Sequence, residues 1–146
     1  MNSLMKDVLF SDEAKLNMQQ HAEASFPDEC CGFLYGNEND HIRKITEAIP
    51  VLNSKEGDKR RRFEIHPLDY MKAERYAMEN GLTFLGIYHS HPQHPAIPSV
   101  HDLKQAVPFF SYPILSIMDG KLDHLRSWQL NDNQEFEEER ILVPTH

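Results

Sequence analysis

The sequence has 146 residues, which fits one domain spanning residues 1–146 and is long enough to bury a hydrophobic core. Its 40% hydrophobic and 26% charged residues exclude intrinsic disorder, and its net charge of −8 argues against nucleic acid as a partner. No apolar run approaches the roughly 20 residues that span a bilayer, and the N-terminal residues lack a signal-peptide stretch, so we expect a cytoplasmic protein with no membrane partner.

The predicted elements alternate between strands and helices along the chain. Ser11 is a candidate N-cap for the first helix, while Pro67 and Gly81 suit the first position and the C-terminal cap of the second. In chain order the predictions are strand 8–10, helix 12–24, strands 30–35, 42–52 and 62–65, helix 67–79, strand 83–91, helix 99–106, and strands 114–118, 122–130 and 136–143. This pattern predicts an α/β fold, a single-domain mixed sheet flanked by helices.

The two charge runs have a simple structural interpretation. The basic run 59–62 stands between acidic residues, and the acidic run 137–139 lies in the last predicted strand, so we interpret both as solvated. The second helix carries the large apolar residues Leu68, Met71 and Met78.

The two cysteines, Cys30 and Cys31, are neighbours in the sequence. Neighbouring residues form no ordinary disulfide without severe strain, and the chain has no third cysteine. The pair also lacks the C-x-x-C spacing of a zinc site. We therefore interpret both as small buried packing residues.

Histidines are concentrated in one part of the chain, at positions 89, 91, 94 and 101. Side chains alternate between the two faces of a strand, so His89 and His91 point the same way from the end of the apolar strand 83–91. Pro92 then ends this strand. Two imidazoles about 7 Å apart along the backbone can converge on one metal ion, although H-x-H also occurs by chance at solvated strand ends.

Ser99 and Asp102 open the predicted helix over 99–106. Their S-x-x-D spacing is close to a capping box, in which both side chains satisfy free N–H groups of the first helical turn. The same geometry could aim Asp102 back at His89 and His91. Two nitrogens, one carboxylate oxygen and a water would then form the open tetrahedral site that is typical of catalytic zinc. The spacing by itself leaves both interpretations open.

Two segments of the chain form one composite motif. The first is the run His89-Ser90-His91-Pro92, six residues, Ser99, two residues and Asp102. The second is residues 27–36, which have the form Pro-x-Glu-x-Cys-Gly followed by apolar residues and Gly. Together they resemble the signature of the JAMM (MPN+) metalloprotease family at every spacing. The resemblance extends from the first helix through the strand at 114–118 and implies the JAMM/MPN fold, which is cytidine-deaminase-like.

The resemblance implies a role for each motif residue. His89, His91 and Asp102 would bind one zinc ion. Glu29 would accept a proton from the attacking water and return it to the leaving amine. Ser99 would hydrogen-bond the developing oxyanion, in addition to capping its helix. Without the resemblance, nothing distinguishes Glu29 from the other acidic residues, which number 23 in all, and it would be interpreted as a turn residue after the first helix.

The resemblance also implies a class of substrate. Family members that cut ubiquitin chains carry insertions for which this chain has little room, so the chain looks like the compact prokaryotic type. Proteins of that type are similar to hydrolases that act at the C-terminus of a ubiquitin-like or sulfur-carrier protein or of its amino-acid adduct. We therefore expect a zinc metallopeptidase that cuts a peptide or isopeptide bond of such a carrier protein; its oligomeric state is left open.

Other interpretations fit the sequence less well. His89-x-His91-x-x-His94 has the spacing of the metallo-β-lactamase motif, but Gln93 stands where that motif has Asp, and the chain is short for that fold. The paired zinc-deaminase motifs, H-x-E followed by P-C-x-x-C, are not both present, because the chain has no P-C-x-x-C. A non-enzymatic module of the same fold and a cell-wall or phage-tail peptidase remain as alternatives. His94 and His101 match no required family position and are interpreted as surface residues.

Overall fold

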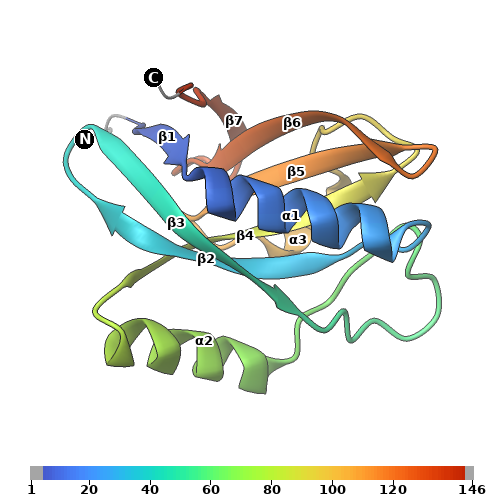
Figure 1. Cartoon of the computed structure of the whole chain (residues 1–146), viewed down its shortest axis with the longest axis horizontal. Coiled ribbons are helices and arrows are strands. Elements are labelled where there is room, and N and C mark those ends of the chain that lie inside the picture. The colour runs from blue at the N-terminus through green and yellow to red at the C-terminus, as the bar shows by residue number, and fades with distance from the viewer. Residues whose placement is uncertain (1–4, 144–146) are drawn as a thin grey trace.

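The computed structural model of the protein describes residues 5–143, which form a seven-stranded sheet with helices on both faces (Figure 1). In chain order the elements are β1 (Asp7–Phe10), α1 (Asp12–Ser25), β2 (Cys31–Glu38), β3 (Ile42–Val51), α2 (Pro67–Glu79), β4 (Thr83–Pro92), α3 (Val100–Gln105), β5 (Ser111–Met118), β6 (Lys121–Leu130) and β7 (Phe136–Glu139). The strand order is β1-β3-β2-β4-β5-β6-β7, with parallel and antiparallel pairs. The predicted α/β fold, a mixed sheet flanked by helices, is confirmed. None of the helices in these residues is long and apolar enough to cross a membrane.

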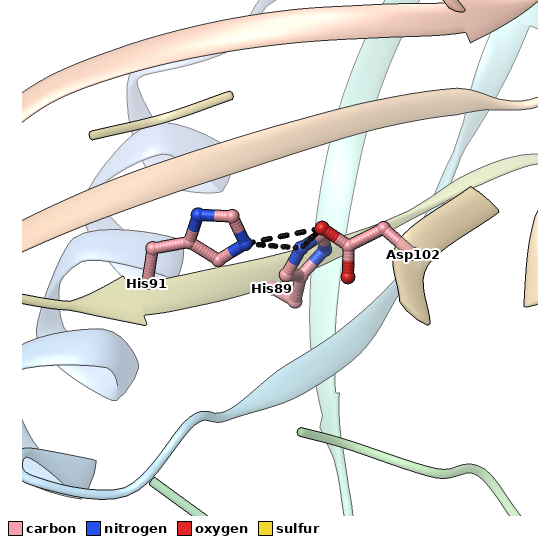
Figure 2. Close-up of side chains that lie close together, drawn as sticks. All are labelled: His89, His91 and Asp102. Carbon is pink, nitrogen blue, oxygen red and sulfur yellow. Dashed lines mark hydrogen bonds and ion pairs between the residues drawn. The ribbon is translucent and has the colours of Figure 1, made fainter. Parts of the chain in front are cut away.

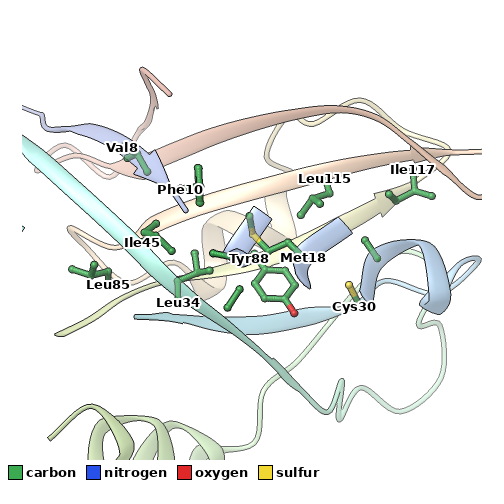
Figure 3. Close-up of a cluster of buried hydrophobic side chains, with 13 residues drawn as sticks. Val8, Phe10, Met18, Cys30, Leu34, Ile45, Leu85, Tyr88, Leu115 and Ile117 are labelled. Carbon is green, nitrogen blue, oxygen red and sulfur yellow. The ribbon is translucent and has the colours of Figure 1, made fainter. Parts of the chain in front are cut away.

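Helix α1 begins where the sequence predicts and covers one face of the sheet. Ser11 caps it, because the Ser11 hydroxyl accepts a hydrogen bond of 3.0 Å from the backbone N–H of Ala14. Ala14, Met18 and Ala22 recur every four residues and are all buried, so one stripe of the helix contacts the strands. The three residues belong to one buried cluster with apolar side chains of the sheet, and Figure 3 shows Met18 near Leu34, Tyr88 and Leu115.

The two edges of the sheet meet. The backbone N–H of Val8 in β1 donates to the carbonyl of Arg140 at 2.9 Å, and the N–H of Leu142 donates to the carbonyl of Val8 at 2.8 Å. These bonds form a parallel bridge between Val8 and Ile141, which lies just after β7. Backbone groups that would otherwise offer a template for pairing with another chain are therefore satisfied within the molecule.

Strand β4 lies near the middle of the sheet and packs on both faces. Leu85 and Tyr88 belong to the core under α1, whereas Ile87 belongs to a second core under α2 that also contains Ala73 and Ala77. β4 pairs with β2 in an antiparallel manner and with β5 in parallel. A strand supported on both faces and by two neighbours is a rigid base for the residues at its carboxyl end.

The sequence predicts a strand over 62–65, and this prediction is wrong: the segment is an irregular loop. The side chain of Asn53 makes hydrogen bonds to this segment that a neighbouring strand would otherwise make. Its Oδ1 accepts from the N–H of Glu64 at 3.1 Å, and its Nδ2 donates to the carbonyl of Arg62 at 3.2 Å. The N–H of Ser54 donates to the carbonyl of Glu64 at 2.9 Å. Strand propensity cannot predict that a side-chain amide will form hydrogen bonds with the backbone in this way.

Helix α2 packs against the sheet through small residues, and its large apolar residues face away from the sheet. Leu68, Met71 and Met78 are 57%, 59% and 82% exposed, whereas Ala73 and Ala77 are buried. The two alanines lie four residues apart and so share one side of the helix. Small residues on that side let the helix approach an aromatic layer on β2 and β4, which includes Phe33, Tyr35 and Phe84.

Strand β7 ends at Glu139, short of the predicted 136–143, and its acidic run is not wholly solvated. The two preceding glutamates are exposed, but Glu139 is only 3% exposed. Its carboxyl group accepts hydrogen bonds from the hydroxyls of Ser127 at 2.7 Å and Ser111 at 2.9 Å. Arg43 donates to the Ser111 hydroxyl at 2.9 Å. The interpretation of Glu139 as solvated is therefore wrong, because contacts with β5 and β6 bury this one carboxyl group, and the run of glutamates in β7 does not reveal them.

The buried position of Glu139 predicts a pH-dependent stability. Burial raises the pKa of Glu139 from 4.5 to about 7, and the bonds from Ser127 and Ser111 only partly oppose this. A carboxyl group whose pKa is raised by folding stabilises the protein less and less as the pH rises from about 4.5 through about 7. We expect Glu139→Gln to lose less unfolding free energy over this range than wild type, by about 1–3 kcal/mol. Urea denaturation at both pH limits measures the difference, and parallel profiles would contradict it.

Candidate metal centre and active site

The candidate site lies where the carboxyl end of β4 meets the start of β2. The antiparallel register pairs Cys31 with His89. Side chains at alternate positions share a face, so Glu29 comes to the same face as His89 and His91 although far from them in the sequence. All four residues are buried. The structure thus brings together the two segments of the composite motif.

Backbone contacts hold Glu29 in this position. Ser90, between the two histidines, donates its N–H to the carbonyl of Cys30 at 3.1 Å and accepts from the Cys30 N–H through its hydroxyl at 2.9 Å. The N–H of Glu29 itself donates to the carbonyl of Lys59 at 2.7 Å, and Asn53 Nδ2 donates to the carbonyl of Glu29 at 3.2 Å. The backbone around Glu29 is thus held by three segments, whereas Oε1 of its side chain is buried and finds no hydrogen-bond partner among the described residues.

The glycine of the upstream segment has a packing role. Gly32 lies directly opposite Tyr88 on β4, and a Cβ at Gly32 would lie 2.2 Å from the Tyr88 ring. The Tyr88 hydroxyl is 2.7 Å from Nδ1 of His21 on α1. Only glycine lets this ring cross β2 to reach the helix, which explains one motif position that carries no chemistry.

Three ligand atoms converge at the end of β4 (Figure 2). Nε2 of His89 and Nε2 of His91 are 3.2 Å apart, and Oδ2 of Asp102 is 3.2 Å from the first and 3.1 Å from the second. All three side chains are buried, and together they could hold a metal ion. Both histidines come from β4, whereas Asp102 reaches them from α3.

The ring of His91 is oriented by a carbonyl group. Nδ1 of His91 lies 2.9 Å from the carbonyl oxygen of Pro95, which can only accept, so Nδ1 carries a proton and Nε2 is the nitrogen that faces His89 and Asp102. The ring of His89 packs against Phe63 with 4.7 Å between ring centroids. Its Nδ1 is buried and finds no hydrogen-bond partner within residues 5–143.

Ser99 and Asp102 form a complete capping box on α3 and serve the site at the same time. The Asp102 N–H donates to the Ser99 hydroxyl at 3.1 Å, and the Ser99 N–H donates to Oδ2 of Asp102 at 2.8 Å. That same Oδ2 is the atom that faces the two histidines. The two interpretations that the sequence leaves open therefore coexist: the cap fixes the carboxylate, and the carboxylate completes the cluster.

The protonation states follow from burial and from these bonds. Burial lowers the pKa of His89, which favours its neutral imidazole, although the nearby Asp102 opposes this shift. Burial alone would raise the pKa of Asp102, but the contacts with His89 and His91 and the bond from the Ser99 N–H lower it, so the carboxylate is ionised. Burial raises the pKa of Glu29 to about 9, and the charge of Asp102 adds to this. A cation at the three-ligand cluster would oppose that rise, because positive charge favours the carboxylate.

The residues fit a zinc ion. Around a tetrahedral zinc with bonds of about 2.0–2.1 Å, ligand atoms stand about 3.3 Å apart, close to the distances between the three atoms here. Because Nδ1 of His91 donates to the Pro95 carbonyl, Nε2 is the nitrogen of this ring that is left to bind a metal ion. The lowered pKa values of His89 and Asp102 also suit metal ligands, because a metal ion requires deprotonated ligand atoms.

A cavity of about 570 Å³ opens beside the cluster. Its lining residues are Glu29, Arg61, His91, His94, Pro95, Ile97 and Ser99. Arg61, from the basic run, and His94 are exposed, as the sequence predicts. The sequence gives no sign, however, that these two residues line the cavity. His101 lies on α3 and lines neighbouring hollows instead.

Comparison with known proteins identifies the family. The sequence model of the family described as "Prokaryotic homologs of the JAB domain" matches residues 11–131. The chain therefore belongs to this prokaryotic JAB/MPN family, as its composite motif predicts.

Relatives agree with this assignment. The chain is 31% identical over 115 residues to a desampylase from Pyrococcus furiosus, a match that covers 79% of this chain and 76% of that protein. It is 39% identical over 93 residues to a probable TtuB-protein conjugate cleaving protease from Thermus thermophilus, which covers 64% and 59%. A protein from Desulfitobacterium hafniense, whose structure was solved in solution, matches with a TM-score of 0.82 and 28% identity over 95% of this chain and 94% of that one.

Proposed function

We propose that this protein is a zinc-dependent peptidase that hydrolyses a peptide or isopeptide bond at the C-terminus of a ubiquitin-like or sulfur-carrier protein, or of its amino-acid adduct. The main observation that supports this proposal is the position of Glu29. Its Oε1 is buried and has no hydrogen-bond partner among the described residues, and its side chain lines the cavity beside the three-ligand cluster. An unpaired buried carboxyl group is destabilising, which is expected of a group kept for chemistry. Relatives named as a desampylase and a conjugate cleaving protease support the class of substrate.

The proposed mechanism divides the work between three parts of the site. When bound by His89, His91 and Asp102, a zinc ion supplies Lewis acidity that makes water nucleophilic near neutral pH. Glu29 accepts a proton from the attacking water and later donates it to the leaving amine. Ser99 accepts from the Asp102 N–H through its oxygen, so its own O–H is free to donate to the carbonyl oxygen of the scissile bond.

Hydrolysis of a defined carrier conjugate tests the proposal. The substrates are a ubiquitin-like carrier ending in Gly-Gly that is joined through its C-terminus to a lysine side chain, to a peptide or to cysteine. We expect the zinc-loaded protein to release the amine from at least one of them, and a chelator to abolish release, as measured by mass spectrometry. Binding without release would indicate a non-enzymatic module. Cleavage of a cell-wall peptide alone would indicate the other class of peptidase.

Substitutions of Ser99 distinguish its capping role from its proposed catalytic role. Loss of the cap alone in Ser99→Ala should lower the free energy of unfolding by about 0.5–2 kcal/mol and leave kcat unchanged. Loss of an oxyanion donor should in addition lower kcat by about 10²–10³-fold, and this is the result we expect.

Ser99→Asp is the matched variant, because aspartate caps helices well but puts a negative charge where the oxyanion develops. We expect it to have near wild-type stability and very low kcat. Steady-state kinetics and urea denaturation of both variants separate the two roles. Normal turnover by Ser99→Asp would assign Ser99 to capping alone.

A further inference from the structure

The loop between β4 and α3 is held at one residue, Ala96. This residue is fully buried although its neighbours Pro95 and Ile97 are exposed. Its N–H donates to Nε2 of His124 at 3.0 Å, and its carbonyl accepts from Nε1 of Trp128 at 2.9 Å. Both backbone groups of one loop residue are therefore satisfied by side chains from a different part of the chain.

The two side chains form a matched donor and acceptor pair on β6. His124 and Trp128 lie four residues apart on this strand and so share a face. The Ala96 N–H can only donate, so Nε2 of His124 must be unprotonated, and its proton lies on Nδ1, which is 2.7 Å from Oδ2 of Asp123. Asp123 thus selects the tautomer of His124 that Ala96 requires. We call His124 and Trp128 the Ala96 clamp.

The clamped loop carries groups that face the proposed metal site. The carbonyl next to Ala96 is that of Pro95, which orients His91 through Nδ1. Pro95 and Ile97, on either side of Ala96, form one wall of the cavity that contains Glu29. A shift of the Ala96 backbone would therefore move both the wall and the acceptor that sets the tautomer of His91.

We infer that His124 and Trp128 are positioning residues, which hold the Pro95 carbonyl against His91 and thereby favour the metal-binding tautomer of that ligand. Neither residue lines the cavity, so neither is a catalytic residue. The inference rests on the proposed function in so far as His91 is a zinc ligand. It adds a residue pair on β6, beyond the composite motif, that the site needs for full zinc affinity.

Two substitutions remove one half of the clamp each. His124→Leu removes the acceptor for the Ala96 N–H, and Trp128→Phe removes the indole N–H while it keeps an aromatic ring. We expect the zinc dissociation constant to rise by about tenfold in each, the lower end of the effect typical of residues that support a metal ligand. Competition with a chromogenic chelator measures it. Amide exchange by NMR should show that the Ala96 N–H exchanges at least about tenfold faster in His124→Leu.

Two further variants serve as controls. His124→Gln offers an amide oxygen where Nε2 lies and should keep zinc affinity within about twofold of wild type. Tyr76→Phe on α2 loses one hydrogen bond of a half-buried aromatic residue, 3.0 Å to Glu47, and has no link to the loop. It should leave zinc affinity and Ala96 exchange unchanged, which separates the clamp from a general loss of stability.

The outcomes separate this inference from the proposed function. Wild-type zinc affinity in both His124→Leu and Trp128→Phe would overturn the inference, whatever the exchange of Ala96. A tenfold loss in Tyr76→Phe as well would also overturn it. Zinc binding that depends on the clamp in a protein that hydrolyses no carrier conjugate would uphold the inference and reject the proposed peptidase activity.

Discussion

Glu29→Gln is expected to lower kcat by about 10²–10⁴-fold while zinc content and substrate binding stay at the wild-type level. Glutamine keeps the shape of the side chain but cannot accept a proton, and proton transfer by a positioned group is worth about this factor. Glu29 is not one of the three ligands that converge at the end of β4, so the metal should remain. Single-turnover kinetics together with elemental analysis of the purified variant measure both quantities.

Asp28→Asn is the matched control for this experiment. Asp28 is the neighbouring carboxylate, but it is exposed and lies outside the lining of the cavity. We expect it to keep wild-type kcat. Near-normal turnover by Glu29→Gln would reject Glu29 as the proton acceptor, and Asp28 would then be the first residue to reconsider. Loss of zinc from Glu29→Gln would instead indicate that Glu29 is a ligand.

His89→Ala is expected to reduce zinc from about one ion per chain to a small fraction and to abolish hydrolysis. Its Nε2 lies 3.2 Å from the ligand atoms of both His91 and Asp102, so its loss leaves two ligands where a catalytic zinc site has three. Elemental analysis after purification without added metal or chelator measures the content. His89→Gln, which fills more of the same buried space, gives a second reading if the alanine variant folds poorly.

His94→Ala provides the comparison, because His94 lines the same cavity but is exposed and is not part of the three-ligand cluster. It should retain zinc at the wild-type level. A wild-type zinc content in His89→Ala would reject the proposed site. Equal loss in both histidine variants would indicate that the metal is bound in a different way.

Asp102 illustrates how one small element can serve both a helix cap and the proposed metal site. A capping box needs a carboxylate that turns back over the first helical turn, and a metal site needs a carboxylate held rigidly at the edge of a cavity. The box formed by Ser99 and Asp102 meets both needs, since Oδ2 accepts from the Ser99 N–H and also faces the two histidines. The stability of α3 and the geometry of the site are therefore coupled, and this is why the Ser99 variants must be measured for both.

Features that depend on one short segment can be predicted from the sequence. The stripe Ala14, Met18 and Ala22 on α1 follows from helical spacing, and the common face of His89 and His91 follows from strand alternation. The motif spacing identifies the family without any coordinates. In each case the relevant interaction is between residues close in the sequence, so backbone geometry alone determines how they lie.

Features that depend on how distant segments meet were decided only by the tertiary structure. Glu29 reaches the histidines because Cys31 pairs with His89, and a shift of that register by one residue would turn Glu29 to the other face. The burial of Glu139 depends on the contacts of β7 with β6 and β5, and the loop over 62–65 depends on one asparagine side chain. Packing between segments sets these contacts, and no periodicity within a single segment encodes it.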